Sequence, residues 1–161
     1  MPRSPAIARS VAILVAAVAL LGAAGCGSKK NDLAPAACLV TNQGYLRALQ
    51  RAPAAVRLAG TTAISNCLVP EQDAGQLANI GHEMIIAATK LNAEARRDPG
   101  GSATLQLGYL LGAIAKGADP IHTDLVRRLN SAARFSQTGA TLPASFERAF
   151  GRGYATGHSS G

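Results

Sequence analysis

The fold is decided by residues 70–116, which read PEQDAGQLANIGHEMIIAATKLNAEARRDPGGSATLQLGYLLGAIAK. Large apolar residues recur at steps of three or four on both sides of the Asp-Pro-Gly-Gly at 98–101, a period typical of one buried face of an α-helix. Proline suits the first turn of a helix, and paired Pro and Gly favour a turn. The stretch therefore predicts a long helix from Pro70 to Arg97, a tight turn, and a second helix over about 102–116.

Two more helices are predicted toward the C-terminus. Asp119 and Pro120 combine a capping side chain with a proline at the first helical position, and an apolar stripe follows them. Leu-Pro at 142–143 begins the last helix. Glycines and small polar residues then predict a frayed tail over 153–161.

Toward the N-terminus the helical signals are shorter. Thr41 predicts the start of a helix that Pro53 breaks or kinks and that ends near Gly60. Residues 62–69 predict one or two helical turns, and no strand-like alternation persists anywhere in the sequence. We therefore predict an all-α domain over 38–152, a small irregular bundle of four or five antiparallel helices.

The first 25 residues differ from the rest. Arg3 and Arg9 precede a continuous apolar run at 11–21, and small residues follow it. A positive segment, a short apolar segment and a small-residue exit are typical of an export signal, and the run is too short for a membrane-spanning helix. Residues 1–25 are predicted to be a signal peptide.

The segment LGAAGC at 21–26 resembles the lipobox of bacterial lipoproteins. The resemblance implies that a diacylglycerol is attached to the Cys26 thiol, that the signal is cut just before it, and that the protein is exported and anchored to the outer face of the bacterial cell membrane or to another envelope membrane. Residues 26–37 are polar and rich in helix breakers, and are predicted to be a flexible tether. Lys29 and Lys30 favour nearby anionic headgroups.

Two other outcomes remain open for this segment. Ala23 stands where lipoboxes usually carry Leu, and Gly22 and Ala24 form a small pair that suits ordinary signal cleavage. Cleavage after Ala24 gives a soluble secreted protein. The remaining alternative is an uncleaved anchor.

The cysteine count supports the lipidated form. The chain has three cysteines, so lipid on Cys26 leaves Cys38 and Cys67 as an even pair in an oxidising compartment. We predict a disulfide between them, with two buried free thiols as the alternative. In the chain-entropy model such a link contributes about 3–4 kcal/mol to stability. No further metal ligands stand at a suitable spacing.

The charge balance narrows the kinds of partner. The chain carries 16 Lys and Arg against 9 Asp and Glu, or +7, and the loss of Arg3 and Arg9 with the signal leaves +5. The remaining arginines are scattered and few aromatics lie between them, which disfavours nucleic acid. Anionic lipid, an anionic envelope polymer or an envelope protein are the predicted partners, and a merely solvated surface is the alternative.

No catalytic, metal-binding or cofactor-binding site is predicted. His82 and Glu83 begin a sequence like the HExxH of zinc proteases, but Ile86 stands where the second His is required. His122 and Asp124 are two residues apart on a helix and point away from each other. Neither a phosphate-binding Gly-rich loop nor a nucleophile elbow occurs.

Two glycines, Gly108 and Gly112, lie one turn apart among leucines. In a short segment with polar flanks, this spacing predicts close helix packing inside the bundle. Tyr109 between them is predicted to lie in the core or at its boundary, with its hydroxyl reaching a partner or water.

The last predicted helix carries aromatic and basic residues that are candidates for binding a membrane or a partner. Phe146, Phe150 and Tyr154 recur every four residues, while Arg148 and Arg152 lie nearly opposite. One interpretation is a helix that lies on an anionic membrane or binds a partner. The other is that the aromatic residues simply pack onto the bundle.

Together these features predict a membrane-anchored envelope lipoprotein with a non-catalytic interaction or structural domain. Two alternatives remain: a carrier or sensor that holds a small apolar ligand between helices, and an enzyme in which the fold brings carboxylates to His82 or His122.

Overall fold

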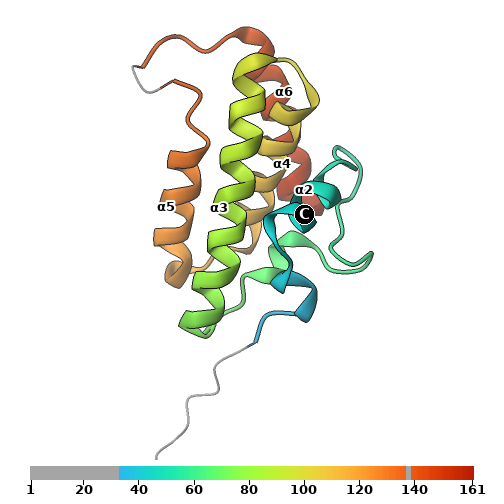
Figure 1. Ribbon diagram of the computed structural model, residues 1–161, viewed down its shortest axis with the longest axis vertical. Helices are drawn as coiled ribbons and strands as arrows, with labels where there is room; N and C mark the ends of the chain where they lie inside the picture. Colours follow the sequence, from blue (N-terminus) through green and yellow to red (C-terminus); the bar gives the residue numbers. More distant parts are fainter. Residues whose placement is uncertain (1–32, 137–138) are drawn as a thin grey trace, which may run out of the picture. The chain divides into compact units, whose positions relative to one another are not determined.

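The computed structural model describes residues 33–136 and 139–161 (Figure 1). In these ranges the chain forms five α-helices and three short 3-10 segments, and no β-strand. The helices are α2 (Asn42–Leu49), α3 (Ala74–Arg97), α4 (Ser102–Gly117), α5 (Thr123–Ala132) and α6 (Ala144–Ser160), and the 3-10 segments are η1 (Ala36–Leu39), η2 (Ile64–Cys67) and η3 (Pro120–His122). The predicted all-α class is confirmed.

The domain begins earlier than predicted. The predicted signal peptide at 1–25 and the predicted lipidation site, Cys26, lie outside the described residues. Within them, Ala34 is buried and its N–H donates to the Oε1 of Gln76 in α3 at 2.6 Å. The predicted tether, 26–37, therefore extends too far, because its last residues pack against the bundle.

Helices α3 and α4 form the predicted hairpin around the turn at 98–101, but α3 begins at Ala74 rather than at Pro70. The carboxylate of Asp73 accepts a hydrogen bond from the Gln76 N–H at 2.9 Å and so caps the helix. Glu71 has a φ of 56°, in the left-handed region, which is incompatible with a continuous helix from Pro70.

The prediction that residues 153–161 fray is wrong, because α6 continues through Ser160. Gly153 and Gly157 face α4, and a Cβ added to either would overlap a backbone carbonyl oxygen of α4. Glycine lowers local helix propensity, but here it lets two helix backbones touch, and this packing stabilises the helical form.

The predicted close packing of Gly108 and Gly112 is confirmed, with α6 as the partner. A Cβ on Gly108 would meet the backbone of Phe150 and Tyr154, and one on Gly112 would meet that of Tyr154 and His158. Residue numbers on α4 and on the facing positions of α6 increase in the same direction, so the two helices run parallel. The prediction of antiparallel helices therefore fails for the pair whose backbones are in contact.

Helix α2 ends at Leu49, well before the predicted end near Gly60. Thr41 precedes it, but the Thr41 side chain makes no capping hydrogen bond. Glu83 of α3 acts instead: its Oε2 accepts from the Asn42 side chain at 2.9 Å and from the Asn42 N–H at 2.6 Å. These hydrogen bonds lower the pKa of Glu83, and a carboxylate suits the positive end of a helix.

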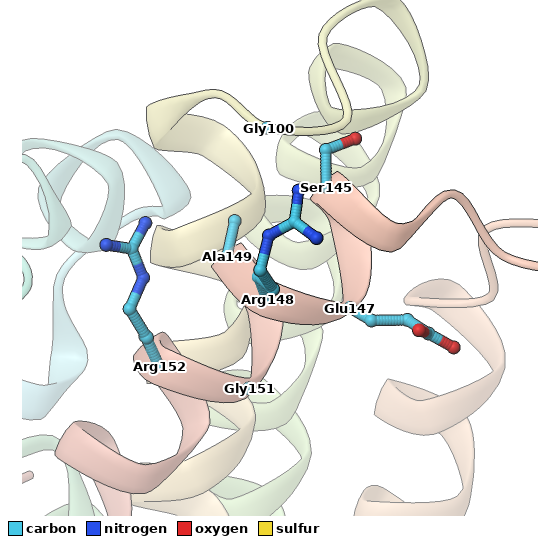
Figure 2. A pocket seen from close by; sticks show the side chains of 7 residues that line it. All are labelled: Gly100, Ser145, Glu147, Arg148, Ala149, Gly151 and Arg152. Atoms are coloured by element: carbon cyan, nitrogen blue, oxygen red, sulfur yellow. The ribbon is translucent and has the colours of Figure 1, made fainter.

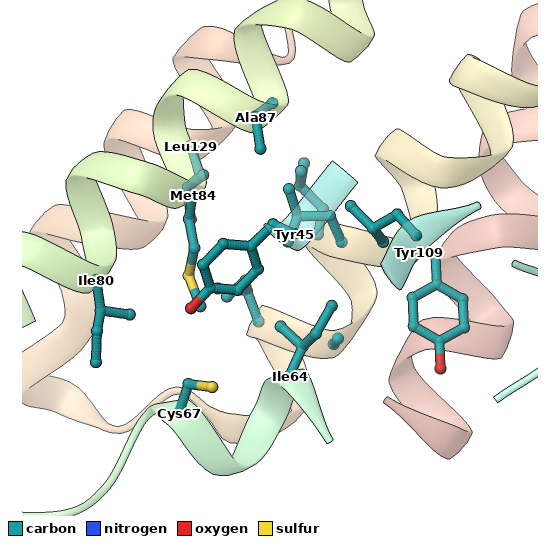
Figure 3. Packing of buried hydrophobic residues seen from close by; sticks show 14 of the residues in the cluster. Tyr45, Ile64, Cys67, Ile80, Met84, Ala87, Tyr109 and Leu129 are labelled. Carbon is teal, nitrogen blue, oxygen red and sulfur yellow. The ribbon is translucent and has the colours of Figure 1, made fainter. Parts of the chain in front are cut away.

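The predicted disulfide is present and joins η1 to η2, with the Cα atoms of Cys38 and Cys67 5.5 Å apart and both side chains fully buried. Figure 3 shows Cys67 among the buried side chains of the core, which include Tyr45 of α2 and Met84 of α3. The Tyr45 hydroxyl donates to the Cys38 carbonyl at 2.8 Å. Burial raises the pKa of Tyr45, so this hydroxyl keeps its proton.

Candidate binding surface on helix α6

Helix α6 presents different chemistry on its sides, because residues three and four apart share a face. The side that packs on α4 consists of small residues, Ala149, Gly153 and Gly157. Two further sides of α6 are named here by their residues, the aromatic side and the basic side. The aromatic side holds Phe146, Phe150 and Tyr154, and the basic side holds Ser145, Arg148 and Arg152.

The aromatic side is a row of stacked rings. The ring centroids are 5.5 Å apart between Phe146 and Phe150 and 6.3 Å apart between Phe150 and Tyr154. Phe135, which follows α5, adds a tilted contact to Phe146 at 4.6 Å. Phe146 is buried whereas Tyr154 is 37% exposed. The interpretation that the aromatic residues pack onto the bundle is thus confirmed for Phe146, whereas Tyr154 at the other end of the row reaches solvent.

An open cavity of about 750 Å³ lies beside this row. Phe135, Phe146, Phe150 and the 37%-exposed Leu142 contribute apolar walls. Carbon-rich walls with aromatic rings are typical of sites that hold apolar groups.

A second open cavity, of about 550 Å³, lies on the basic side, where the N-terminal part of α6 meets Gly100 (Figure 2). A Cβ added to Gly100 would lie 3.4 Å from the Cβ of Ser145, so the turn before α4 is in contact with α6. In Figure 2 the side chains of Arg148 and Arg152 rise on the side of α6 that faces Gly100, the Ser145 hydroxyl turns away from Gly100, and Glu147 points to the other side. The space is therefore bordered by hydrogen-bond donors.

His122 is fully buried in a network that holds three segments together. Its Nδ1 accepts from the Asp119 N–H at 2.9 Å, so its Nε2 carries the proton and donates to the Gln72 Oε1 at 3.2 Å. The Gln72 side-chain N–H donates in turn to the Cys67 carbonyl at 3.1 Å. Both ring nitrogens are thus engaged by the fold, which favours a structural role for His122.

This network predicts that the domain loses stability in mild acid. Burial lowers the pKa of His122 more than nearby Asp119 raises it. Below the ordinary pKa of about 6.5, the unfolded chain takes up a proton that the folded chain resists. Stability is therefore full above that pH and falls as the pH drops toward the lowered value, by at most about 1.4 kcal/mol per pH unit for this one proton.

Urea denaturation at a series of pH values between neutral and mildly acidic checks this prediction. His122→Asn keeps an acceptor for the Asp119 N–H and removes the titration, so it should flatten the slope. His82→Gln removes an exposed histidine and serves as the matched control. Equal slopes in the wild type and in His122→Asn would contradict the role given to His122.

The predicted candidates are not brought together into one site. His82 is exposed on α3, whereas His122 is buried at the start of α5. No group of three or more His, Cys, Asp or Glu residues able to hold a metal ion occurs in the described ranges. In the same residues, none of the helices combines the length and apolarity needed to cross a lipid bilayer.

Sequence reasoning did not single out Gln72, Phe135 or the position of Ser145 beside the cavity on the basic side. Ser145 precedes Arg148 by three residues, and this helical spacing could have placed both on one side of α6. No local signal points to Gln72, because its contact with His122 joins residues 50 positions apart.

No protein-family model, curated protein sequence or solved structure matches this chain.

Proposed function

We propose that this protein is a lipoprotein, anchored through Cys26 to the outer face of the bacterial cell membrane, whose helical domain is a non-catalytic binding module. The observation that carries the binding role is α6, which packs backbone to backbone on α4 while its aromatic and basic sides reach the surface. A side chain on a rigid helix loses less conformational entropy on binding than one on a mobile loop. The lipobox-like segment at 21–26 supports the anchor.

The surface of α6 favours an envelope protein or an anionic envelope polymer as the partner. Aromatic and arginine side chains are enriched at protein interfaces. Arg148 and Arg152 are exposed and one turn apart, and the predicted mature chain is positive overall. Positive charge attracts anionic partners at long range.

A second candidate function is supported by the cavity beside the aromatic side. Its volume of about 750 Å³ and its phenylalanine walls suit a small apolar ligand, so the domain could act as a carrier or sensor. Organic extraction of the purified protein distinguishes the two functions, because a carrier should release a stoichiometric apolar molecule.

The anchor is tested by metabolic labelling with a palmitate analogue in a bacterial host. Cys26→Ser is expected to abolish labelling and to shift the protein from the membrane fraction to the soluble fraction, because the lipid chains supply the stable attachment. Labelling is read by in-gel detection, and the distribution by fractionation.

The matched control is Cys38→Ser/Cys67→Ser, which retains Cys26 and should still be labelled. Equal labelling of Cys26→Ser and the wild type would sink the lipoprotein proposal. A soluble, unlabelled wild type cleaved after Ala24 would favour the secreted form instead.

A further inference from the structure

The basic side of α6 groups three hydrogen-bond donors around one cavity. Ser145, Arg148 and Arg152 are spaced three and four residues apart, so they share one side of the helix. With Gly100 they border an open space of about 550 Å³ (Figure 2). Because Gly100 has no side chain, the turn before α4 approaches Ser145 without filling this space.

These donors have no partner within the described residues. Neither the Ser145 hydroxyl nor the guanidinium of Arg148 or Arg152 makes a hydrogen bond or an ion pair in residues 33–136 and 139–161. Glu147 is the one carboxylate that lines the cavity, and its side chain points away from the arginines (Figure 2). Two positive charges therefore face the same space without neutralisation.

The position of these charges is unfavourable for the helix itself. Arg148 and Arg152 are the fifth and ninth of the 17 residues of α6, so neither cation lies in the last turn, where the helix dipole would favour it. Like charges four residues apart also repel each other. Such a departure from local stability rules is expected at a binding site, where a ligand removes the repulsion.

We propose that this cavity binds the phosphate group of a phosphomonoester carried by a small, polar, water-soluble molecule. The inference rests on the binding role proposed for α6, but not on the lipid anchor. A phosphomonoester carries a charge of about −1.5 to −2 at neutral pH, which matches two guanidinium groups. A carboxylate, with one negative charge, leaves one arginine unneutralised.

The geometry of the donors also suits phosphate. Guanidinium groups bind phosphate oxygens through paired N–H donors, and a serine hydroxyl adds a second kind of donor. Arg148 and Arg152 stand one helical turn apart, so both can approach one group from neighbouring positions. A cavity of about 550 Å³ also leaves room for the polar molecule that carries the phosphate.

The location of the cavity favours a soluble ligand over a lipid headgroup. The chain that follows the predicted anchor joins the bundle at Ala34. The Ala34 N–H donates a hydrogen bond to Gln76 in the first turn of α3. Gly100 follows the last turn of α3. The 24 residues of that helix rise about 36 Å, so the cavity and Ala34 lie at opposite ends of α3.

Isothermal titration of the full chain in uncharged detergent micelles tests the proposal. The probes are glucose 6-phosphate, with glucose and glucuronate for comparison, and phosphatidic acid added to the micelles as a lipid phosphomonoester. We expect saturable binding of glucose 6-phosphate, weakened about tenfold or more in Arg148→Gln/Arg152→Gln and about threefold in Ser145→Ala. Arg127→Gln/Arg128→Gln removes the same charge from α5 and should change the affinity less than about twofold.

Four results would overturn the inference. They are absence of saturable glucose 6-phosphate binding, equal weakening in the α5 control, equally tight binding of glucuronate, and arginine-dependent binding of phosphatidic acid in preference to glucose 6-phosphate. The last result assigns the cavity to a lipid headgroup. Fatty-acid labelling tests the anchor alone. Copurification of a partner that is lost when Tyr154 is substituted tests the binding role of α6 without involving phosphate. Failure of the cavity and failure of the proposed function are therefore distinguishable.

Discussion

Gly157→Ala is expected to lower the free energy of unfolding by about 2 kcal/mol or more, although alanine is the better helix former. The added Cβ would overlap the carbonyl oxygen of Tyr109 on α4, so the two helices must separate. Overpacking of this kind typically costs about 1–3 kcal/mol, and rigid backbone atoms cannot rotate away as a side chain can. Urea denaturation followed by far-ultraviolet circular dichroism measures the change.

The same helix supplies a matched control. Gly151 is exposed, and a Cβ added there would meet nothing within 4 Å. Gly151→Ala is therefore expected to raise the unfolding free energy by about 0.5–1 kcal/mol through helix propensity alone. If Gly157→Ala were as stable as Gly151→Ala, α6 could not lie backbone to backbone on α4. Gly112→Ala, on the facing helix, should reproduce the loss.

Removal of the disulfide has the second large expected effect. Cys38→Ala/Cys67→Ala should lower the unfolding free energy by about 3–4 kcal/mol, because the unfolded chain regains the freedom of a loop closed over 29 positions. The loss matters for this domain, which has six aromatic residues in all and no tryptophan with which to build a core. Denaturation with and without reductant measures it.

The double variant also provides the control for the reductant. Reductant should destabilise the wild type by about the same amount as the double substitution and should leave the variant unchanged. Alkylation of the denatured, unreduced protein offers an independent check, since Cys38 and Cys67 should stay unmodified. Modification of both thiols without reductant would show that the link does not form in the protein as it is made.

Most of the helices could be predicted because apolar periodicity, turn residues and capping residues act over only a few positions of the chain. The apolar period over 70–116 and the turn at 98–101 located α3 and α4 to within a few residues, and Asp119-Pro120 located the turn that leads into α5. The start of α3 was misplaced because Pro70 and Asp73 are both good first-turn signals, and only the left-handed backbone at Glu71 separates them.

The candidate surface was predictable in part. The aromatic and basic sides of α6 follow from helical spacing, so Phe146, Phe150, Arg148 and Arg152 were identified from the sequence. Their surroundings were not, because Gly100 reaches Ser145 only through the packing of α4 on α6, and Phe135 reaches Phe146 only through the connection that follows α5.

The sequence by itself determined the helical class, the pairing of Cys38 with Cys67 and the turns, since each depends on neighbours along the chain or on a simple count of cysteines. Only the tertiary structure decided that residues 153–160 are helical. Glycine weakens an isolated helix through backbone entropy, which predicts fraying. Against α4 the same missing Cβ atoms permit backbone contact along the helix, and the packing gained there outweighs that entropy.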